Sequence, residues 1–76
     1  MQSTERLPAP QRRQQILDTA LELFAERGYS ATSTRVLAQR LGVSEALIFR
    51  YFATKRDILL ALISSRAMER SEGEAA

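Results

Sequence analysis

The 76-residue sequence contains no cysteine and no histidine. Their absence excludes disulfides and thiol chemistry, and it removes the most common metal ligands and the most common general base at neutral pH. No pair of carboxylates falls on a predicted buried face, so the usual arrangement for acid–base catalysis is also missing. We therefore expect a protein that is not an enzyme and that holds no cofactor and no metal.

Long apolar runs are missing as well. The longest purely apolar run extends from Ile58 to Ile63, far below the roughly 18 residues that span a bilayer. The polar start from Met1 to Arg6 lacks the apolar centre of a signal peptide. A helix that lies on a membrane surface carries cations along its polar face. The polar face of the first predicted helix carries acids instead. We expect a cytoplasmic protein without a membrane partner.

Positive charge exceeds negative charge only slightly. The hydrophobic content of 45% and the charged content of 26% describe one small folded domain with a net charge of +2. Three of its acids, Glu69, Glu72 and Glu74, lie close to the C-terminus. Between Arg12 and Arg56, eight lysine and arginine residues face four acids, a balance of +4. That excess is compatible with a polyanionic partner without proving one.

Apolar residues recur at helical spacing after a leader, residues 1–10, that we expect to be flexible. A first helix from Gln11 is indicated by a stripe of side chains three and four residues apart: Ile16, Leu17, Ala20, Leu21 and Phe24. Asp18, Glu22 and Glu26 lie off this stripe. Gly28 should end the helix in the left-handed conformation.

Three further helices follow. The second is predicted over Thr34 to Leu41 and ends at Gly42. Ser44 is a good N-cap for a third helix from Glu45 to Tyr51 or Phe52. Thr54 and Asp57 resemble a capping box, so a fourth helix should start near Lys55 and present three apolar residues to the first: Ile58, Leu59 and Leu62. Beyond Met68 we expect fraying.

The second and third helices are too closely joined to pack side by side, so they must cross at a steep angle. Ala38, then Gly42 four residues later and an apolar residue at Ile48, match the helix-turn-helix pattern. This corner would hold the third helix out from the surface, where it can enter a DNA major groove about 12 Å wide.

The combined spacing resembles the DNA-binding domain of the tetracycline-repressor (TetR) family. The resemblance covers about Arg12 to Ile63 and rests on these elements: Ile16-Leu17 with Ala20, Leu23-Phe24, Gly28-Tyr29, Ala31-Thr32, Leu37-Ala38, Leu41-Gly42-Val43-Ser44, Phe49-x-Tyr51-Phe52 and Lys55. It implies an all-α fold: a three-helix, homeodomain-like helix-turn-helix domain over residues 11–68, with the motif at 33–52 and the start of a fourth linking helix.

The resemblance also implies a function, sequence-specific binding of double-stranded DNA, and most often repression of transcription. Thr34 matches a phosphate-binding position, and Lys55 matches a cation that binds the DNA backbone. Seven residues match the DNA-facing surface of the family's recognition helix. Its groove-facing start corresponds to Ser44, Glu45, Ala46 and Leu47, and the rest of the surface to Phe49, Arg50 and Tyr51.

Three positions depart from the family's usual residues. Glu45 either reads a cytosine amino group or stabilises the helix start, and we favour the helix start. Leu47 either packs on a thymine methyl group or turns inward as core, and the sequence does not choose between them. Phe49 keeps the ring of the usual tyrosine but loses its hydroxyl bond to phosphate, which should lower the affinity for DNA.

Several side chains can be explained without a contact to DNA. Isolated cations such as Arg50 and Lys55 can be plain solvated charges. Three arginines, Arg6, Arg12 and Arg13, could form a minor-groove arm, although we expect them to be solvated. Phe24, Tyr29 and Phe52 are predicted to fill the core rather than to stack on bases.

Members of the family continue into a helical domain that binds a small-molecule effector and dimerises, and we expect these 76 residues not to include that domain. We therefore expect a fragment with a frayed acidic tail at 69–76, monomeric by itself, whose full-length form is a homodimer. Leu60 and Ile63 should be left exposed. In the rival hypothesis of a protein-interaction module, the same corner presents Leu47 and Phe49 to another protein.

Overall fold

The computed structural model describes residues 9–75, with side chains for residues 9–65. The expected leader, including Arg6, lies outside this range except for Ala9 and Pro10. Both of these residues already belong to the first helix, which therefore begins two residues earlier than predicted. Proline is tolerated there because backbone N–H groups in the first turn have no partner within the helix.

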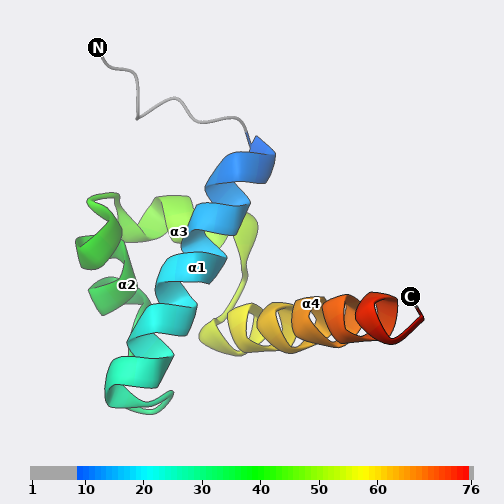
Figure 1. The fold of residues 1–76 in the computed structure, drawn as a ribbon. Coiled ribbons are helices and arrows are strands. Elements are labelled where there is room, and N and C mark those ends of the chain that lie inside the picture. Colours follow the sequence, from blue (N-terminus) through cyan, green and yellow to red (C-terminus); the bar gives the residue numbers. More distant parts are fainter. Residues whose placement is uncertain (1–8, 76) are drawn as a thin grey trace.

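Within the described residues the fold consists of four helices and no strand, which confirms the all-α prediction. The helices are α1 (Ala9–Arg27), α2 (Thr34–Leu41), α3 (Glu45–Tyr51) and α4 (Lys55–Ala75). α1 packs against both α2 and α4, and α2 packs against α3. In Figure 1, α2 lies on one side of α1, α3 runs from that side behind α1, and α4 leads away on the other side.

α4 continues past Met68, where the sequence analysis expected a frayed tail, and ends at Ala75. Gly73 is the only strongly helix-disfavouring residue in this stretch, since alanine, glutamate and arginine all favour the helix.

The core lies where α1 meets the other three helices. Its apolar members are Ile16, Leu17, Ala20, Leu23, Leu37, Ala38, Ile48, Phe52, Ile58 and Leu62. Burial of each large aliphatic side chain contributes about 1.5–3 kcal/mol. Two expected members lie outside this core: Leu21 is exposed and Leu59 is only half-buried. Leu23, which was not part of the predicted stripe, is fully buried instead.

Of the three aromatic residues expected to fill the core, Phe52 and Phe24 do so or pack on it, whereas Tyr29 is half-buried and packs on Phe24. Phe52 is buried and Phe24 packs against the core. Tyr29 stacks on Phe24 with the ring centroids 5.3 Å apart and the planes tilted by 60°. Tilted pairs of this kind are favoured by the charge distribution of the rings.

Candidate nucleic-acid interface

The turn between α2 and α3 sets the direction of α3. Gly42, where the second helix was expected to end, has φ +74° and ψ +31°, which is the left-handed conformation. The N–H of Gly42 donates to the carbonyl of Gln39 (3.2 Å), and that of Val43 donates to the carbonyl of Ala38 (3.0 Å). This pair of bonds is the Schellman motif that ends many helices. Ser44 then accepts from the N–H of Leu47 at 3.1 Å and caps α3 as predicted.

α3 has one buried face and one exposed face. Ile48 is fully buried, and Tyr51 packs against the core from the same side. The opposite side carries Ala46, Phe49 and Arg50, all exposed. Residues that are one, two or five positions from Ile48 along an α-helix point away from it, so this division follows from the helix geometry. The corner therefore holds a short helix by one face and leaves the other to solvent.

Leu47 does not turn inward as a core residue, and its packing on a thymine methyl group stays a prediction. Its side chain is half-buried and is not one of those that pack on the core. Phe49 is 47% exposed, an uncommon position for a phenylalanine in a small protein. Leu47 and Phe49 thus give the free side of α3 an apolar part, next to the cation of Arg50.

Tyr51 is placed less favourably for a DNA contact than the family pattern implies. Its ring is half-buried against the core, which leaves only part of the side chain open to a ligand. The position of Tyr51 one turn after Ile48 accounts for this burial.

Thr34 and Glu45 contact each other. The Oγ1 hydroxyl of Thr34, the first residue of α2, donates to Oε2 of Glu45, the first residue of α3, over 2.6 Å. The bond therefore joins the starts of the two helices of the motif. Sequence reasoning missed this contact, because neither residue's local pattern reveals an interaction across eleven positions.

Lys55 lies half-buried at the start of α4. Its Nζ donates to the carbonyl oxygen of Tyr29 (2.8 Å) and lies 4.1 Å from the centre of the Tyr29 ring. Lys55 therefore ties α4 to the turn between α1 and α2. It is therefore not a plain solvated charge, which was one of the two interpretations of the sequence.

Thr32 also holds that turn. It is only 1% exposed, and its hydroxyl donates to the carbonyl of Gly28 at 2.8 Å, with the carbonyl of Leu23 more distant at 3.4 Å. The sequence analysis did not identify Thr32 as a buried residue. Ser33 beside it is the N-cap of α2, accepting from the N–H of Val36 at 3.0 Å.

The expectation that Arg12 is simply solvated was wrong. Arg12 is 7% exposed and donates to the side chain of Gln15, three residues later in α1, at 2.7 Å. Arg13 is exposed, as expected, and its guanidinium lies over the ring of Phe52, 5.0 Å from the ring centre.

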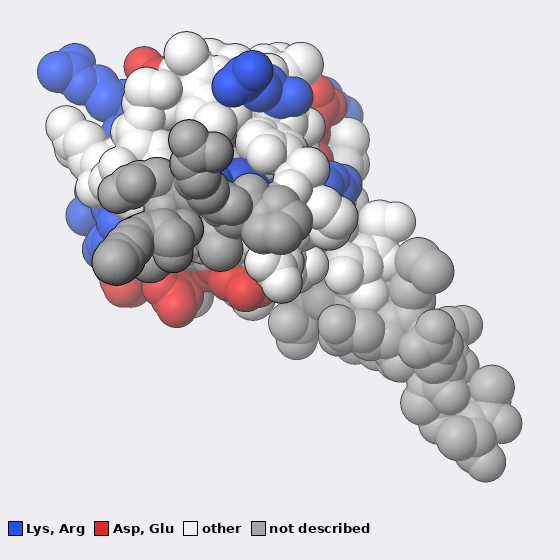
Figure 2. Space-filling view, turned by 90° about the horizontal axis from the view of Figure 1, so that it is seen from above, with Lys and Arg blue, Asp and Glu red and all other residues white. Residues whose placement is uncertain are grey.

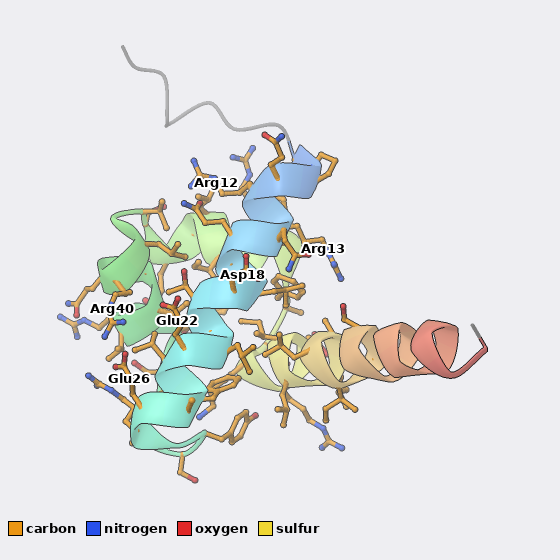
Figure 3. The ribbon with its side chains drawn as sticks, in the orientation of Figure 1. Arg12, Arg13, Asp18, Glu22, Glu26 and Arg40 are labelled. Atoms are coloured by element: carbon orange, nitrogen blue, oxygen red, sulfur yellow. The ribbon has the colours of Figure 1, made fainter. Side chains whose placement is uncertain are left out.

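Charges are divided between the faces of the molecule. Asp18, Glu22 and Glu26 lie along the face of α1 that is turned to the viewer in Figure 3. In Figure 2 most of the acidic side chains in view gather along one edge of the head, and the basic side chains lie elsewhere on it. Arg50 is exposed on α3, away from the core face of that helix. This distribution keeps the acids of α1 apart from α3.

One exposed ion pair connects α1 with α2. Glu26 accepts from Arg40, with Nη2 and Oε1 3.1 Å apart (Figure 3). This hydrogen bond, aided by the charge of Arg40, lowers the pKa of the Glu26 carboxyl below its ordinary value. Both side chains are well exposed, and ion pairs of that kind contribute little to stability.

Two classes of site are not found in the described residues. They contain no helix long and apolar enough to cross a membrane. They also contain no group of three or more acidic residues placed to hold a metal ion.

Comparisons with known proteins decide the family. Residues 16–62 match the family described as bacterial regulatory proteins, tetR family. The chain belongs to this family. The family is the one that the resemblance predicted.

Individual relatives agree with this assignment. Over 78% of the chain, 40% of residues are identical to the HTH-type transcriptional regulator YvkB of Bacillus subtilis. The HTH-type transcriptional repressor AcnR of Corynebacterium diphtheriae is 39% identical over 80% of the chain. The HTH-type transcriptional activator FasR of Mycolicibacterium smegmatis is 40% identical over 76% of it.

Solved structures share the fold. AmtR of Mycobacterium smegmatis superimposes with a TM-score of 0.75 and 47% identity over 84% of this chain, which is 31% of its own. A TetR/AcrR-family regulator of Thermobifida fusca gives 0.73 and 44% over 79%, which is 34% of its own. The chain spans about a third of the length of YvkB and of AcnR, and about a quarter of that of FasR.

Proposed function

We propose that the exposed side of α3 enters the major groove of double-stranded DNA and reads base pairs there. The observation that carries this proposal is the division of α3 into a face anchored by Ile48 and a solvent face formed by Ala46, Phe49 and Arg50. A major groove about 12 Å wide admits an α-helix presented in this way. The Schellman turn at Gly42 supplies the presentation.

Each residue of this surface has a distinct role in the proposal. Ala46 and Leu47 meet base edges, with Leu47 packing on a thymine methyl group. Arg50 neutralises a phosphate, and Phe49 packs its ring against the sugar–phosphate backbone. The Ser44 hydroxyl, whose oxygen is used as a cap, keeps its hydrogen for a phosphate.

Two residues supplement this surface from its edges. Tyr51 offers its hydroxyl from a half-buried ring. Lys55 has three N–H groups and uses one on Tyr29, so the others can reach a phosphate while the tie to the turn is kept.

For the whole protein we propose a cytoplasmic transcriptional regulator without enzymatic activity that acts as a homodimer and represses transcription. Support comes from the family, in which AcnR is named a repressor and FasR an activator. A dimer places two recognition helices on half-sites about one helical turn or a multiple of it apart. Regulation by a small-molecule effector would reside outside the 76 residues.

Selection of duplexes from a random-sequence library tests the reading of bases. The chain should enrich a short consensus, and Leu47→Ala should change the preferred base at one or two of its positions. Leu60→Ala is the matched control, because Leu60 is an exposed leucine on α4 (49%), outside the motif. It should leave the consensus unchanged.

Failure would take a recognisable form. If no consensus emerges while immobilised chain captures a defined protein through Leu47 and Phe49, the corner is a protein-interaction surface. If Leu60→Ala shifts the consensus as much as Leu47→Ala does, then α3 is not the reading helix.

A further inference from the structure

The contact between Thr34 and Glu45 carries an inference that rests on the proposed DNA binding and refines it. Thr34 stands where the family pattern implies a phosphate contact, but its hydroxyl already donates to the carboxylate of Glu45 over 2.6 Å. A threonine hydroxyl has a single hydrogen to donate. While this bond exists, the hydroxyl cannot also donate to a phosphate oxygen.

The bond is of a strong kind. Its acceptor is a carboxylate, and hydrogen bonds from a hydroxyl to an ionised oxygen are short, at about 2.5–2.7 Å, and roughly twice as strong as neutral ones. The carboxylate would also repel a phosphate that approached Thr34. Both effects act against the same contact with the DNA backbone.

Neighbouring hydroxyls are not restricted in this way. Ser33 and Ser44 each use the oxygen as an acceptor for a backbone N–H, so their hydroxyl hydrogens remain available. Both serines are exposed. The starts of α2 and α3 thus contain two hydroxyls able to donate to phosphate and one, on Thr34, that is withheld.

We infer that Glu45 is a positioning residue that lowers the affinity for DNA of any sequence by withholding the Thr34 hydroxyl from the DNA backbone. Phosphate contacts raise the affinity for every sequence alike, whereas base contacts discriminate between sequences. By removing one backbone contact, Glu45 therefore lowers the affinity for all duplexes by the same factor. This role differs from reading a cytosine and from stabilising the helix start.

A double-mutant cycle tests the inference. The four proteins are the unchanged chain, Thr34→Val, Glu45→Ala and the double variant, each titrated by fluorescence anisotropy into one duplex of random sequence. In the presence of Glu45, Thr34→Val should change the affinity by less than about 2-fold. In the Glu45→Ala background it should weaken binding by about 2- to 10-fold, the value of one ordinary hydrogen bond. Thr34→Ser, which keeps the hydroxyl, should restore the affinity in that background.

The selected consensus duplex supplies a second measurement. Glu45→Ala should strengthen binding to the random duplex and to the consensus duplex by the same factor, so the ratio of the two affinities stays the same. A base-reading role of Glu45 would change that ratio, and a merely structural role would change the thermal midpoint and leave both affinities unaltered in protein that is folded at the assay temperature.

Three results would overturn the inference. Equal losses from Thr34→Val in both backgrounds would mean that Thr34 leaves Glu45 and binds phosphate. No loss in either background would mean that its hydroxyl does not reach DNA. If neither the unchanged chain nor Glu45→Ala binds any duplex, the proposed function fails and the inference with it, which distinguishes that failure from the first two.

Discussion

The two turns that flank α2 look alike in sequence and are held by different means. Each begins with a glycine in the left-handed conformation, Gly28 or Gly42, and each ends on a serine that caps the next helix. The turn before α3 is closed by two backbone bonds of its own. The turn after α1 also has two backbone bonds, from the N–H of Gly28 to the carbonyl of Phe24 and from the N–H of Thr32 to the carbonyl of Tyr29, but it is held by side chains as well.

Those side chains come from different distances along the chain. Thr32 donates to the carbonyl of Gly28 from within the turn, and Lys55 donates to the carbonyl of Tyr29 from the start of α4. The comparison teaches that a short turn can be specified by its own residues, whereas a longer one needs contacts that only the folded chain provides. We therefore expect side-chain substitutions to weaken the first turn and glycine substitutions to weaken both.

The largest effect should come from Thr32→Val, which keeps the shape of the side chain and removes its hydroxyl. The carbonyl of Gly28 would lose its bond from a buried donor, so the free energy of unfolding should fall by about 1–3 kcal/mol in urea denaturation. Thr32→Ser keeps the bond and should be less destabilising. If Thr32→Val were as stable as the unchanged chain, the turn would be held by packing alone.

Substitution of the glycines comes next. Gly42→Val and Gly28→Val should each cost about 1–2 kcal/mol, because a side chain disfavours positive φ. An added Cβ would meet no atom within 4 Å at either position, so strain rather than a clash sets this cost. Thermal melting measures it.

The two variants should differ in DNA binding. Gly42→Val disturbs the presentation of α3 and should weaken duplex binding, while Gly28→Val should leave the affinity of the folded protein nearly unchanged. Intact binding and an unchanged midpoint for Gly42→Val would contradict our description of the corner.

Lys55→Met should have a smaller effect on stability, about 1 kcal/mol, since it keeps the apolar stem and loses one hydrogen bond and the contact with the Tyr29 ring. Chemical denaturation gives the value. Arg56→Met is the matched control, because the neighbouring Arg56 is exposed. Equal stability of the two variants would show that the tie between α4 and the turn is unimportant.

The smallest effect should come from the ion pair between α1 and α2. Arg40→Gln should let the pKa of Glu26 return to its ordinary value and should not measurably change the thermal midpoint. Because the folded-state pKa of Glu26 is lowered, its slight stabilisation exists above the unfolded-state pKa and is lost as pH falls through the folded-state value. A carboxyl titration by NMR tests the shift, and an unmoved Glu26 would disprove the assigned cause.

Much of the fold follows from local sequence for the reason that the second turn illustrates. Gly42 and Ser44 specify the end of one helix and the start of the next through contacts no more than five residues apart, and both were predicted. The pairing of Thr34 with Glu45 and that of Lys55 with Tyr29 span eleven and twenty-six positions. These contacts depend on how α1, α2 and α4 pack against one another. The periodicity within a single helix does not predict that packing.

The candidate site, too, could be predicted from the sequence only in part. The solvent face of α3 could be predicted, because helix geometry opposes Ala46 and Arg50 to Ile48. The degree of exposure of Leu47 could not, since its spacing fitted both a core and a surface position.

The salt dependence of duplex binding tests the central claim, that the free side of α3 contacts DNA, most directly. The logarithm of the affinity should fall linearly with the logarithm of the salt concentration, by roughly 0.9 for each phosphate neutralised. Arg50→Ala should reduce this slope by about 0.9, whereas Arg27→Ala, at the far end of α1 in Figure 1, should leave it unchanged. A flat salt response, or a slope that is the same with and without Arg50, would contradict the account.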